Sequence, residues 1–276
     1  MNILDTILET KRLEVAGLSF AELRRRAEEV ERPTVPFAGA VARSMAPSSG
    51  TVAGTHNIPA AAPQNTPSII AEFKRRSPSK GFINENVDPA TAIRGYAAAG
   101  AAAISVLTDR DYFGGSLNDL VAARAVTAKP LLRKDFVIDP VQICEACIAG
   151  ADAVLLIAAA LAPTQCAELA EFAHSLQLEV LLEIHDETEL GHLNPFVDAV
   201  GVNNRDLTTF VTDTAVSLRL IELLPAGPAR ISESGISEPE TVRRLHRAGF
   251  DGFLMGENFM KRPDPAAALQ QFVSEL

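Results

Sequence analysis

Glu72 and Lys74 stand two residues apart at the end of an apolar run. If this run is a strand, both side chains point to the same face, because side chains repeat with a period of two along a strand. Arg75, Arg76 and Lys80 follow in the next loop. The segment therefore offers a carboxylate for acid–base chemistry and several cations for an anionic ligand.

Two further apolar runs end in side chains that can move protons. Lys134 closes one of them, and Glu183 closes the other. A buried setting raises the pKa of a carboxyl and lowers that of an ammonium, which brings both groups toward acid–base catalysis at neutral pH. A lone charged residue is usually solvated, but several such groups at strand ends indicate a site. The predicted catalytic residues are Glu72, Lys74, Lys134 and Glu183.

Another run offers groups for binding rather than proton transfer. Asn203 and Arg205 share one face of the expected strand by the same period of two. Their amide and guanidinium suit a substrate that carries a carboxylate or a hydroxyl. Phe113, beside two glycines, is either an aromatic wall for a flat ring or an anchor for its loop, and the sequence leaves both interpretations open.

A phosphate site is predicted toward the end of the chain. Glu233, Ser234 and Gly235 end the seventh apolar run, and Gly256 ends the eighth. A glycine lets backbone N–H groups approach a ligand without interference from a Cβ atom. In α/β barrels the loops after the last two strands commonly hold a phosphate, so glycines at both places favour a phosphate over simple turns. Glu257 is an unfavourable neighbour for an anion unless its side chain faces water.

Eight apolar runs stand at regular intervals, and each segment between them is long enough for one helix. The runs cover residues 68–73, 102–107, 130–134, 153–157, 179–184, 198–202, 229–232 and 252–255. Helix starts of the Asp-Pro or capping-box type occur at Asp88, Asp139, Asp186, Ser237 and Asp264. Eight strand–helix units favour a closed (βα)8 TIM barrel of the α/β class. The alternative is an open doubly wound sheet, which usually carries a Gly-x-Gly-x-x-Gly loop that is missing here.

Residues 1–67 precede the first run and form an N-terminal helical extension. The capping box at Ser19 predicts a helix over 23–30. Residues 44–67 are rich in Ala, Pro, Ser, Gly and Asn, and we interpret them as a mobile linker in preference to a lid over the active site. The predicted domains are the extension at 1–67 and the barrel at 68–276.

Composition and charge exclude several classes of protein. The chain has 276 residues, of which 47% are hydrophobic and 22% charged, as in a soluble globular enzyme. Its formal net charge of −10 argues against non-specific binding of nucleic acid. No run approaches the ~18 apolar residues of a membrane span, and the N-terminus lacks the pattern of a signal peptide. The sequence therefore predicts a cytoplasmic protein.

The cysteines and histidines give no sign of a metal or redox centre. Cys144 and Cys147 form a Cys-x-x-Cys motif, but the capping pattern at 139–142 places Cys144 inside a helix, away from the N-terminal position that lowers the pKa of a thiol. Cys166 is the only third cysteine, so packing is preferred to a redox or zinc site. The histidines that lack metal-ligand spacing or an evident carboxylate partner, and that we interpret as structural or surface residues, are His174, His185 and His192.

Five segments together resemble the indole-3-glycerol-phosphate synthase family. They are residues 70–79, 132–136, 182–186, 201–207 and 233–236. The resemblance extends from the N-terminal helix to Met260, and its Glu-x-Lys-x-x-Ser-Pro-Ser and Asn-x-Arg-Asp-Leu signatures are highly specific. The stretch at 44–67 is longer than the family leads us to expect.

The resemblance implies a lyase of tryptophan biosynthesis that closes a ring in 1-(2-carboxyphenylamino)-1-deoxyribulose 5-phosphate, with loss of CO2 and water. It implies that Lys134 acts on the ketone oxygen, that Glu183 and Lys74 assist loss of the hydroxyl, and that Glu72 positions the lysines. The substrate-binding residues that it implies are Ser77, Phe113, Asn203, Arg205, Glu233, Ser234, Gly235 and Gly256. It implies a small phosphorylated substrate, no nucleic acid, no membrane, no metal and no organic cofactor, and it leaves open whether other enzymes of the pathway bind to the protein.

Other functions remain open on the residues alone. A sugar-phosphate isomerase or a Schiff-base aldolase could use Lys134 and the phosphate loops, although an isomerase would not need so many cations. A barrel without catalytic activity could bind an anionic metabolite or serve as a scaffold. Borohydride trapping would identify an aldolase, and turnover by the purified chain would exclude a scaffold.

Overall fold

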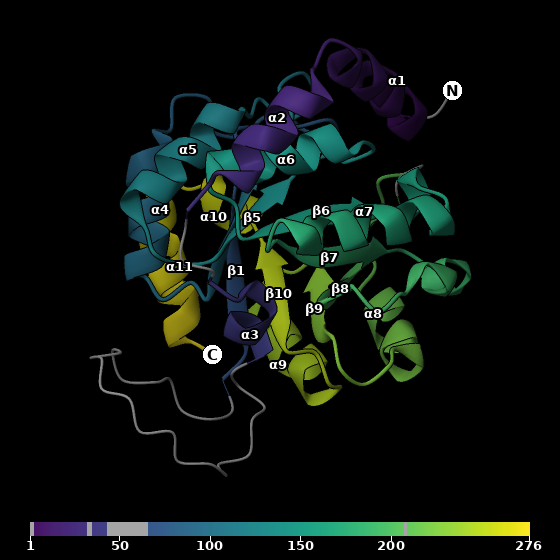
Figure 1. Ribbon diagram of the computed structural model, residues 1–276. Helices are drawn as coiled ribbons and strands as arrows, with labels where there is room; N and C mark the ends of the chain where they lie inside the picture. Colours follow the sequence, from purple (N-terminus) through teal and green to yellow (C-terminus); the bar gives the residue numbers. More distant parts are fainter. Residues whose placement is uncertain (1–2, 32–34, 43–65, 207–208) are drawn as a thin grey trace, which may run out of the picture.

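Eight parallel strands close into a barrel surrounded by helices in the computed structural model, which describes residues 3–31, 35–42, 66–206 and 209–276 (Figure 1). The barrel strands are β1 (Ser68–Phe73), β4 (Ala103–Leu107), β5 (Leu131–Lys134), β6 (Ala153–Ile157), β7 (Glu179–Ile184), β8 (Ala199–Asn203), β9 (Ala229–Glu233) and β10 (Gly252–Met255). Neighbours in the barrel follow chain order, and β10 closes it by pairing with β1. The predicted (βα)8 barrel is confirmed, and every apolar run matches its strand to within one residue.

The helices pack around the barrel and mostly begin where the sequence predicts. They are α4 (Pro89–Ala98), α5 (Leu117–Val126), α6 (Pro140–Ala149), α7 (Pro163–Ser175), α8 (Ala215–Leu220), α9 (Pro239–Arg247), α10 (Glu257–Met260) and α11 (Pro265–Ser274), with short 3-10 helices η1 (Ala158–Ala160), η2 (Glu187–His192) and η3 (Ile221–Leu223). A small antiparallel hairpin, β2 (Arg76–Ser77) and β3 (Gly81–Phe82), follows β1. The Asp-Pro starts are confirmed, because Asp88, Asp139 and Asp264 each accept a hydrogen bond from a backbone N–H of the first turn.

Two capping predictions are wrong in detail. Ser237 does not cap α9, because Pro239 takes the first helical position and makes Glu238 the cap residue. Between β7 and β8 only the 3-10 helix η2 forms, since the connection is short. Asp186 caps η2, but the carboxylate of Glu189 accepts from the backbone N–H of His185 and completes no capping box.

The barrel interior changes from apolar to charged along each strand. On three strands an apolar residue lies in the interior core, and the residue two positions later is charged and lies on the same face. These pairs are Leu132 and Lys134, Leu181 and Glu183, and Ile231 and Glu233. The period of two therefore fills the lower interior with hydrocarbon and leaves charge at the carboxyl ends of the strands.

The N-terminal extension reaches both ends of the barrel. It forms α1 (Ile3–Ala16), α2 (Phe20–Glu28) and α3 (Phe37–Ala42). Ser19 is confirmed as the residue that caps α2, because its side chain accepts from the backbone N–H of Glu22, although the helix begins earlier than predicted. Figure 1 shows α1 near the carboxyl ends of the strands and α3 at their amino ends. Phe37 and Val41 are fully buried in the interior core, so α3 closes the bottom of the barrel. The domain division at residue 67 stays a prediction, and the linker prediction for 44–67 falls almost wholly outside the described residues.

The three cysteines are buried in hydrocarbon. Cys144 and Cys147 lie inside α6, and Cys166 lies inside α7. Burial raises the pKa of Cys144 and of Cys166 to about 11, which opposes formation of a reactive thiolate. Within the ranges described above, no helix combines the length and apolar character that a membrane crossing requires.

Gly252→Ala tests whether α3 fills the bottom of the barrel. A Cβ atom at this position would lie 2.3 Å from Cγ1 of Val41. We expect the new methyl group to lower the free energy of unfolding, measured with urea, by roughly 1–3 kcal/mol, because the surrounding core is closely packed. In a Val41→Ala background the same change should cost much less, since the smaller side chain leaves room for the methyl group.

Gly191→Ala is the matched control, because a Cβ atom there meets nothing within 4 Å. An equal loss of stability at both glycines, or an equal cost of Gly252→Ala with and without Val41, would contradict this packing.

Candidate active site

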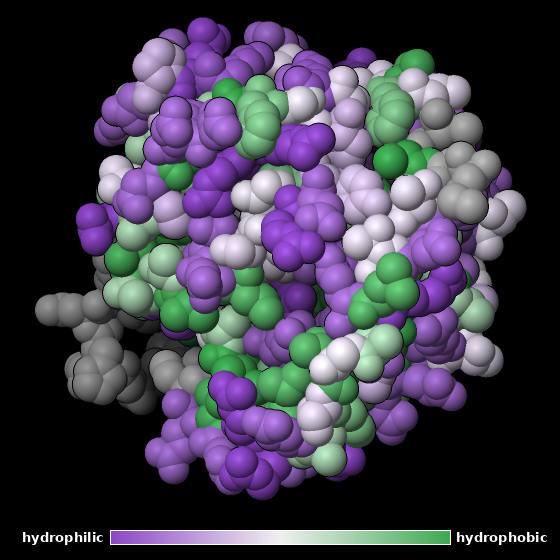
Figure 2. Space-filling view, turned by 90° about the horizontal axis from the view of Figure 1, so that it is seen from above, coloured by the Kyte–Doolittle hydropathy of each residue, from purple (hydrophilic) through white to green (hydrophobic). Residues whose placement is uncertain are grey.

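A cavity of about 480 Å3 opens at the carboxyl ends of the barrel strands. Figure 2 looks onto this end of the molecule, where hydrophilic side chains surround a central hollow. The residues named from the sequence that line the cavity are Glu72, Lys74, Ser77, Phe113, Lys134, Glu183, Asn203, Arg205, Glu233, Ser234, Gly235 and Gly256. The fold thus brings together all the proposed catalytic and substrate-binding residues, whose individual roles stay predictions.

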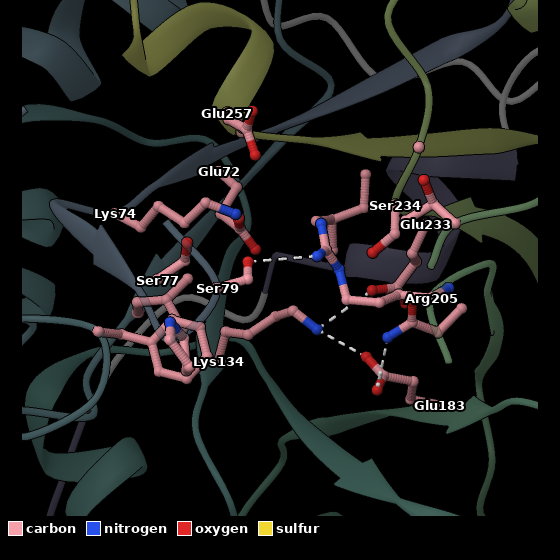
Figure 3. A pocket seen from close by; sticks show the side chains of 18 of the residues that line it. Glu72, Lys74, Ser77, Ser79, Lys134, Glu183, Arg205, Glu233, Ser234 and Glu257 are labelled. Atoms are coloured by element: carbon pink, nitrogen blue, oxygen red, sulfur yellow. Dashed lines mark hydrogen bonds and ion pairs between the residues drawn. The ribbon is translucent and has the colours of Figure 1, made fainter. Parts of the chain in front are cut away.

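Lys134 lies between two buried carboxylates (Figure 3). Its Nζ donates to Oε2 of Glu183 at 2.7 Å and to Oε2 of Glu233 at 3.1 Å. Asn203 completes the group, because its Nδ2 donates to the other oxygen of Glu183 at 3.0 Å. The ammonium and the carboxylate of Glu183 are therefore held in place by side chains from β5, β7, β8 and β9 that meet inside the barrel.

The three charges of this group shift one another's pKa values. Burial lowers the pKa of Lys134, but the charges of Glu183 and Glu233 outweigh burial and raise it, so the amine stays an ammonium. Burial raises the pKa of Glu183, but Lys134 outweighs it and holds that pKa low, at about 2. The pKa of Glu233 rises to about 7 through burial and the nearby charge of Glu183, against the opposing effect of Lys134. At neutral pH the group therefore holds a firm Lys134–Glu183 pair and a carboxyl that can take up a proton.

A second lysine–carboxylate pair lies at the carboxyl end of β1, where Lys74 directly follows the strand. Nζ of Lys74 donates to Oε1 of Glu72 at 2.6 Å, and the Glu72 side chain is almost fully buried. This contact confirms that the two side chains share one face of the strand. The barrel thus presents two ammonium groups, each held by a carboxylate.

Two glycines make room for the buried carboxylates. A Cβ atom at Gly201 would lie 2.0 Å from Oε1 of Glu233. A Cβ atom at Gly256 would lie 2.6 Å from Oε1 of Glu72. Glu72 fills the space that a Cβ atom would need at Gly256, so this glycine is required by the protein itself, and its expected contact with a ligand stays a prediction.

The loop cations divide into two groups. Arg75 makes a two-fold contact with Asp119, at 2.7 and 2.9 Å, and Arg76 donates to a backbone carbonyl; neither lines the cavity. Lys80 does line it, and its Nζ donates to Oε1 of Glu257 at 2.5 Å. Arg205 reaches across the cavity to Ser79, whose Oγ lies 3.4 Å from its Nη1 (Figure 3). The cations available to a ligand therefore come from both sides of the opening, and Arg75 and Arg76 are not among them.

The loops after β9 and β10 form one end of the cavity. Ser234 and Gly235 both have positive φ, at 66° and 70°, so this turn requires an unusual backbone for its serine. The short helix α10 begins at Glu257, directly after β10. The carboxylate of Glu257 is paired with Lys80. This pairing offsets the negative charge that was expected to oppose an anion at this end of the cavity.

The opposite end of the cavity is apolar. Phe113 lines it, and its ring centroid lies 6.1 Å from that of Phe136. Phe136 belongs to the family-like segment 132–136 but is not among the predicted site residues. Ile3, Leu4 and Ile7 of α1 also line the cavity. The amphipathic pattern of α1 predicts a buried face, but no signal in the sequence shows that this face covers the barrel mouth.

The expectation that the histidines lack carboxylate partners is wrong for two of them. Nε2 of His174 lies 2.8 Å from Oδ2 of Asp198 on the outside of the barrel. His185 lies between Glu189, 3.2 Å from its Nδ1, and Glu183, 3.5 Å from its Nε2. Both ring nitrogens of His192 contact backbone carbonyls, as suits a structural residue. In the part of the chain that the structure describes, no cluster of His, Cys, Asp and Glu is arranged to hold a metal ion.

Glu233→Gln tests the buried carboxyl through the pH dependence of stability. Because folding raises the pKa of Glu233 to about 7, its protonated form adds stability below about pH 4.5, and this stability is lost as the pH rises through about 7. The free energy of unfolding of the variant, relative to that of the parent, should therefore be higher at about pH 8 than at about pH 5. The expected increase is roughly 1–3 kcal/mol. Denaturant titrations at the two pH values measure this difference. Glu238→Gln, at an exposed position, is the control and should show no such increase. If the increase in Glu233→Gln is no larger than in this control, the raised pKa of Glu233 is contradicted.

Three comparisons with known proteins agree with this geometry. The family model for indole-3-glycerol phosphate synthase matches residues 4–272. The indole-3-glycerol phosphate synthase of Bacteroides thetaiotaomicron is 47% identical, over 100% of this chain and 99% of its own length. That of Salinibacter ruber is 49% identical, over 75% of this chain and 78% of its own.

A solved structure extends the likeness to the fold. A mutant tryptophan synthase alpha-subunit from Pyrococcus furiosus superposes with a TM-score of 0.55 and 15% identity, over 76% of this chain and 97% of that one. At this identity the likeness concerns the barrel alone. The match over nearly the whole sequence, together with the relatives, shows that the chain belongs to the indole-3-glycerol phosphate synthase family.

Proposed function

We propose that this protein closes the indole ring of indole-3-glycerol phosphate, starting from 1-(2-carboxyphenylamino)-1-deoxyribulose 5-phosphate. The observation that carries the proposal is the position of Lys134, an ammonium held by buried carboxylates in a cavity with one apolar end and one end built from glycine-containing loops. The substrate has the same three parts in the same order: an aromatic ring, a reacting ketone and a phosphate. Family membership supports the same reaction.

Ring closure needs an acid beside the ketone. The ring carbon that bears the carboxylate attacks the ketone carbon, and Lys134 gives a proton to the ketone oxygen as the new bond forms. Loss of CO2 then returns an electron pair to the ring and restores its aromatic character. The strong pairing of Lys134 with Glu183 suits this role, because it holds the acid in place throughout.

Dehydration needs an acid and a base. The hydroxyl leaves as water with a proton from one group, and the neighbouring CH2 gives a proton to another. The ammonium of Lys74 is suited to the first task and the ionised carboxylate of Glu183 to the second. Glu72, paired with Lys74, positions that acid. Products and reactant then balance as indole-3-glycerol phosphate, CO2 and water.

The two substrate ends have natural places in the cavity. The turn at Ser234 and Gly235, with the start of α10, suits the phosphate, because a glycine in such a turn lets backbone N–H groups approach an anion without interference from a Cβ atom. Phe113 and Phe136 suit the aromatic ring. Arg205 lines the cavity, and its guanidinium fork suits the substrate carboxylate.

The alternative functions are less well supported. A Schiff-base aldolase needs a neutral amine, but the neighbouring carboxylates raise the pKa of Lys134 and keep it charged. Among the described residues, no arrangement in the cavity specifically favours an isomerase or a scaffold. We propose one small phosphorylated ligand, a cytoplasmic location, and a functional division between the extension at 1–67 and the barrel at 68–276.

Lys134→Met should nearly abolish turnover. Removal of a positioned acid costs about 10²–10⁴ in rate, whereas the phosphate end of the cavity is unchanged. Formation of the indole product can be followed by its fluorescence, since the chain contains 0 Trp. Inorganic phosphate should bind the variant as it binds the parent. Turnover within about fivefold of the parent would remove Lys134 from its proposed role.

Glu183→Gln and Glu72→Gln should separate the two carboxylates. Glu183→Gln keeps the shape of the site and one acceptor oxygen, for Lys134 or for Asn203, but removes the group that accepts a proton. Single-turnover dehydration should therefore slow while substrate binding changes little. Glu72→Gln should weaken the hold on Lys74 and reduce binding of the anionic substrate together with turnover. Rapid-mixing measurements on both variants distinguish these patterns. Parental single-turnover rates in Glu183→Gln would contradict the division of roles.

A further inference from the structure

Lys11 is a buried cation on the N-terminal helix, outside the catalytic group. Its side chain is only 2% exposed, although Leu13 on the same helix is 75% exposed. Nζ of Lys11 lies 2.8 Å from Oδ2 of Asp109, 3.0 Å from Oδ1 of Asp135 and 2.9 Å from Oε2 of Glu14. One ammonium on α1 thus joins two almost fully buried carboxylates of the barrel.

Each of these barrel carboxylates also shapes a loop of the cavity. Oδ1 of Asp109 accepts hydrogen bonds from the backbone N–H groups of Tyr112, at 2.8 Å, and Phe113, at 3.1 Å. Oδ1 of Asp135 accepts from the backbone N–H of Phe136 at 2.9 Å. Lys11 is therefore in direct contact with the groups that fix both aromatic walls.

The cost of burying these charges suggests a role in positioning. Burial lowers the pKa of Lys11, but the charges of Asp135 and Asp109 outweigh burial and raise it, so the amine is charged in the folded protein. A buried ion cluster adds little stability compared with hydrocarbon of the same volume, yet it permits only one arrangement of its partners. An apolar side chain would attach α1 to the barrel without fixing the loops.

The Lys11 cluster and the phosphate end of the cavity are built from different elements. Lys11 contacts α1, the loop after β4 and the loop after β5. The proposed phosphate end comes from the loops after β9 and β10. A change at Lys11 should therefore act on one end of a ligand and spare the other.

We propose that Lys11 is a positioning residue that aligns α1 with the loops of Phe113 and Phe136, so that three walls meet around the aromatic half of the substrate. The first wall is the Ile3, Leu4 and Ile7 face of α1. The identity of the substrate rests on the proposed function. The alignment of the three elements by one ammonium is independent of that function, because it follows from the contacts of Lys11 alone.

Lys11→Met keeps the length of the side chain and removes its charge. The variant should raise the KM for the substrate by about tenfold or more, because the ring is no longer held in place. Its inhibition constant for inorganic phosphate should stay within about twofold of the parent. Arg12→Gln, which removes a charge from an exposed neighbour on the same helix, should change neither value.

A general loss of structure would move both constants together, and that result would overturn the proposal. An unchanged KM would also overturn it. Lys11→Met could fail to fold, because it leaves the carboxylate of Asp109 buried without its ammonium. In that case a double variant, Lys11→Met with Asp109→Asn, also removes the negative charge of Asp109. The double variant should show the same split between substrate and phosphate.

Amide hydrogen exchange without substrate tests the alignment independently of the reaction. In Lys11→Met, exchange should increase together in α1 and at the amides of Tyr112, Phe113 and Phe136, but not in Arg12→Gln. An increase confined to α1 would overturn the proposal. If the parent shows no turnover, the proposed function fails, while the exchange experiment still decides the role of Lys11.

Discussion

A closed barrel of eight parallel strands has an interior that only side chains can fill, and all its strands end at one rim. In this protein the interior is hydrocarbon in its lower part, closed from below by Phe37 and Val41, and charged in its upper part. The charged groups therefore lie directly above a layer of buried apolar side chains. Buried charges at the rim therefore pair with one another, across the barrel, within one strand end, or with a residue of α1.

This requirement explains the arrangement of the catalytic groups. Lys134 is held by carboxylates from β7 and β9, and Lys74 by Glu72 from its own strand. The pairs hold both lysine side chains in place, so little reorganisation is needed when charge develops on a reacting oxygen. Gly201 is part of the same arrangement, because any side chain there would displace Glu233.

The fold and the membership of the cavity could be predicted because both follow from short-range rules. Period-two alternation gives the inward face of each strand, and parallel topology brings strand ends such as Lys134 and Glu183 together. Contacts between distant segments could not be predicted. The sequence shows that α1 is amphipathic, but not that it covers the mouth or that Lys11 is buried. In the sequence, Arg75 and Lys80 are both loop cations that could bind a ligand. Only the folded structure shows that the guanidinium of Arg75 is already paired with Asp119.

The position of α3 has a consequence for the order in which the molecule is completed. Phe37 and Val41 belong to a segment that leaves the ribosome early, yet Val41 packs beside Gly252, in the last strand to be made. The bottom of the barrel cannot close until nearly the whole chain is available. Contacts of such long sequence separation form slowly, so the apolar side chains of α3 stay without their final partners during synthesis. The same helix that seals the finished barrel is thus an exposed hydrophobic segment while the chain is being made.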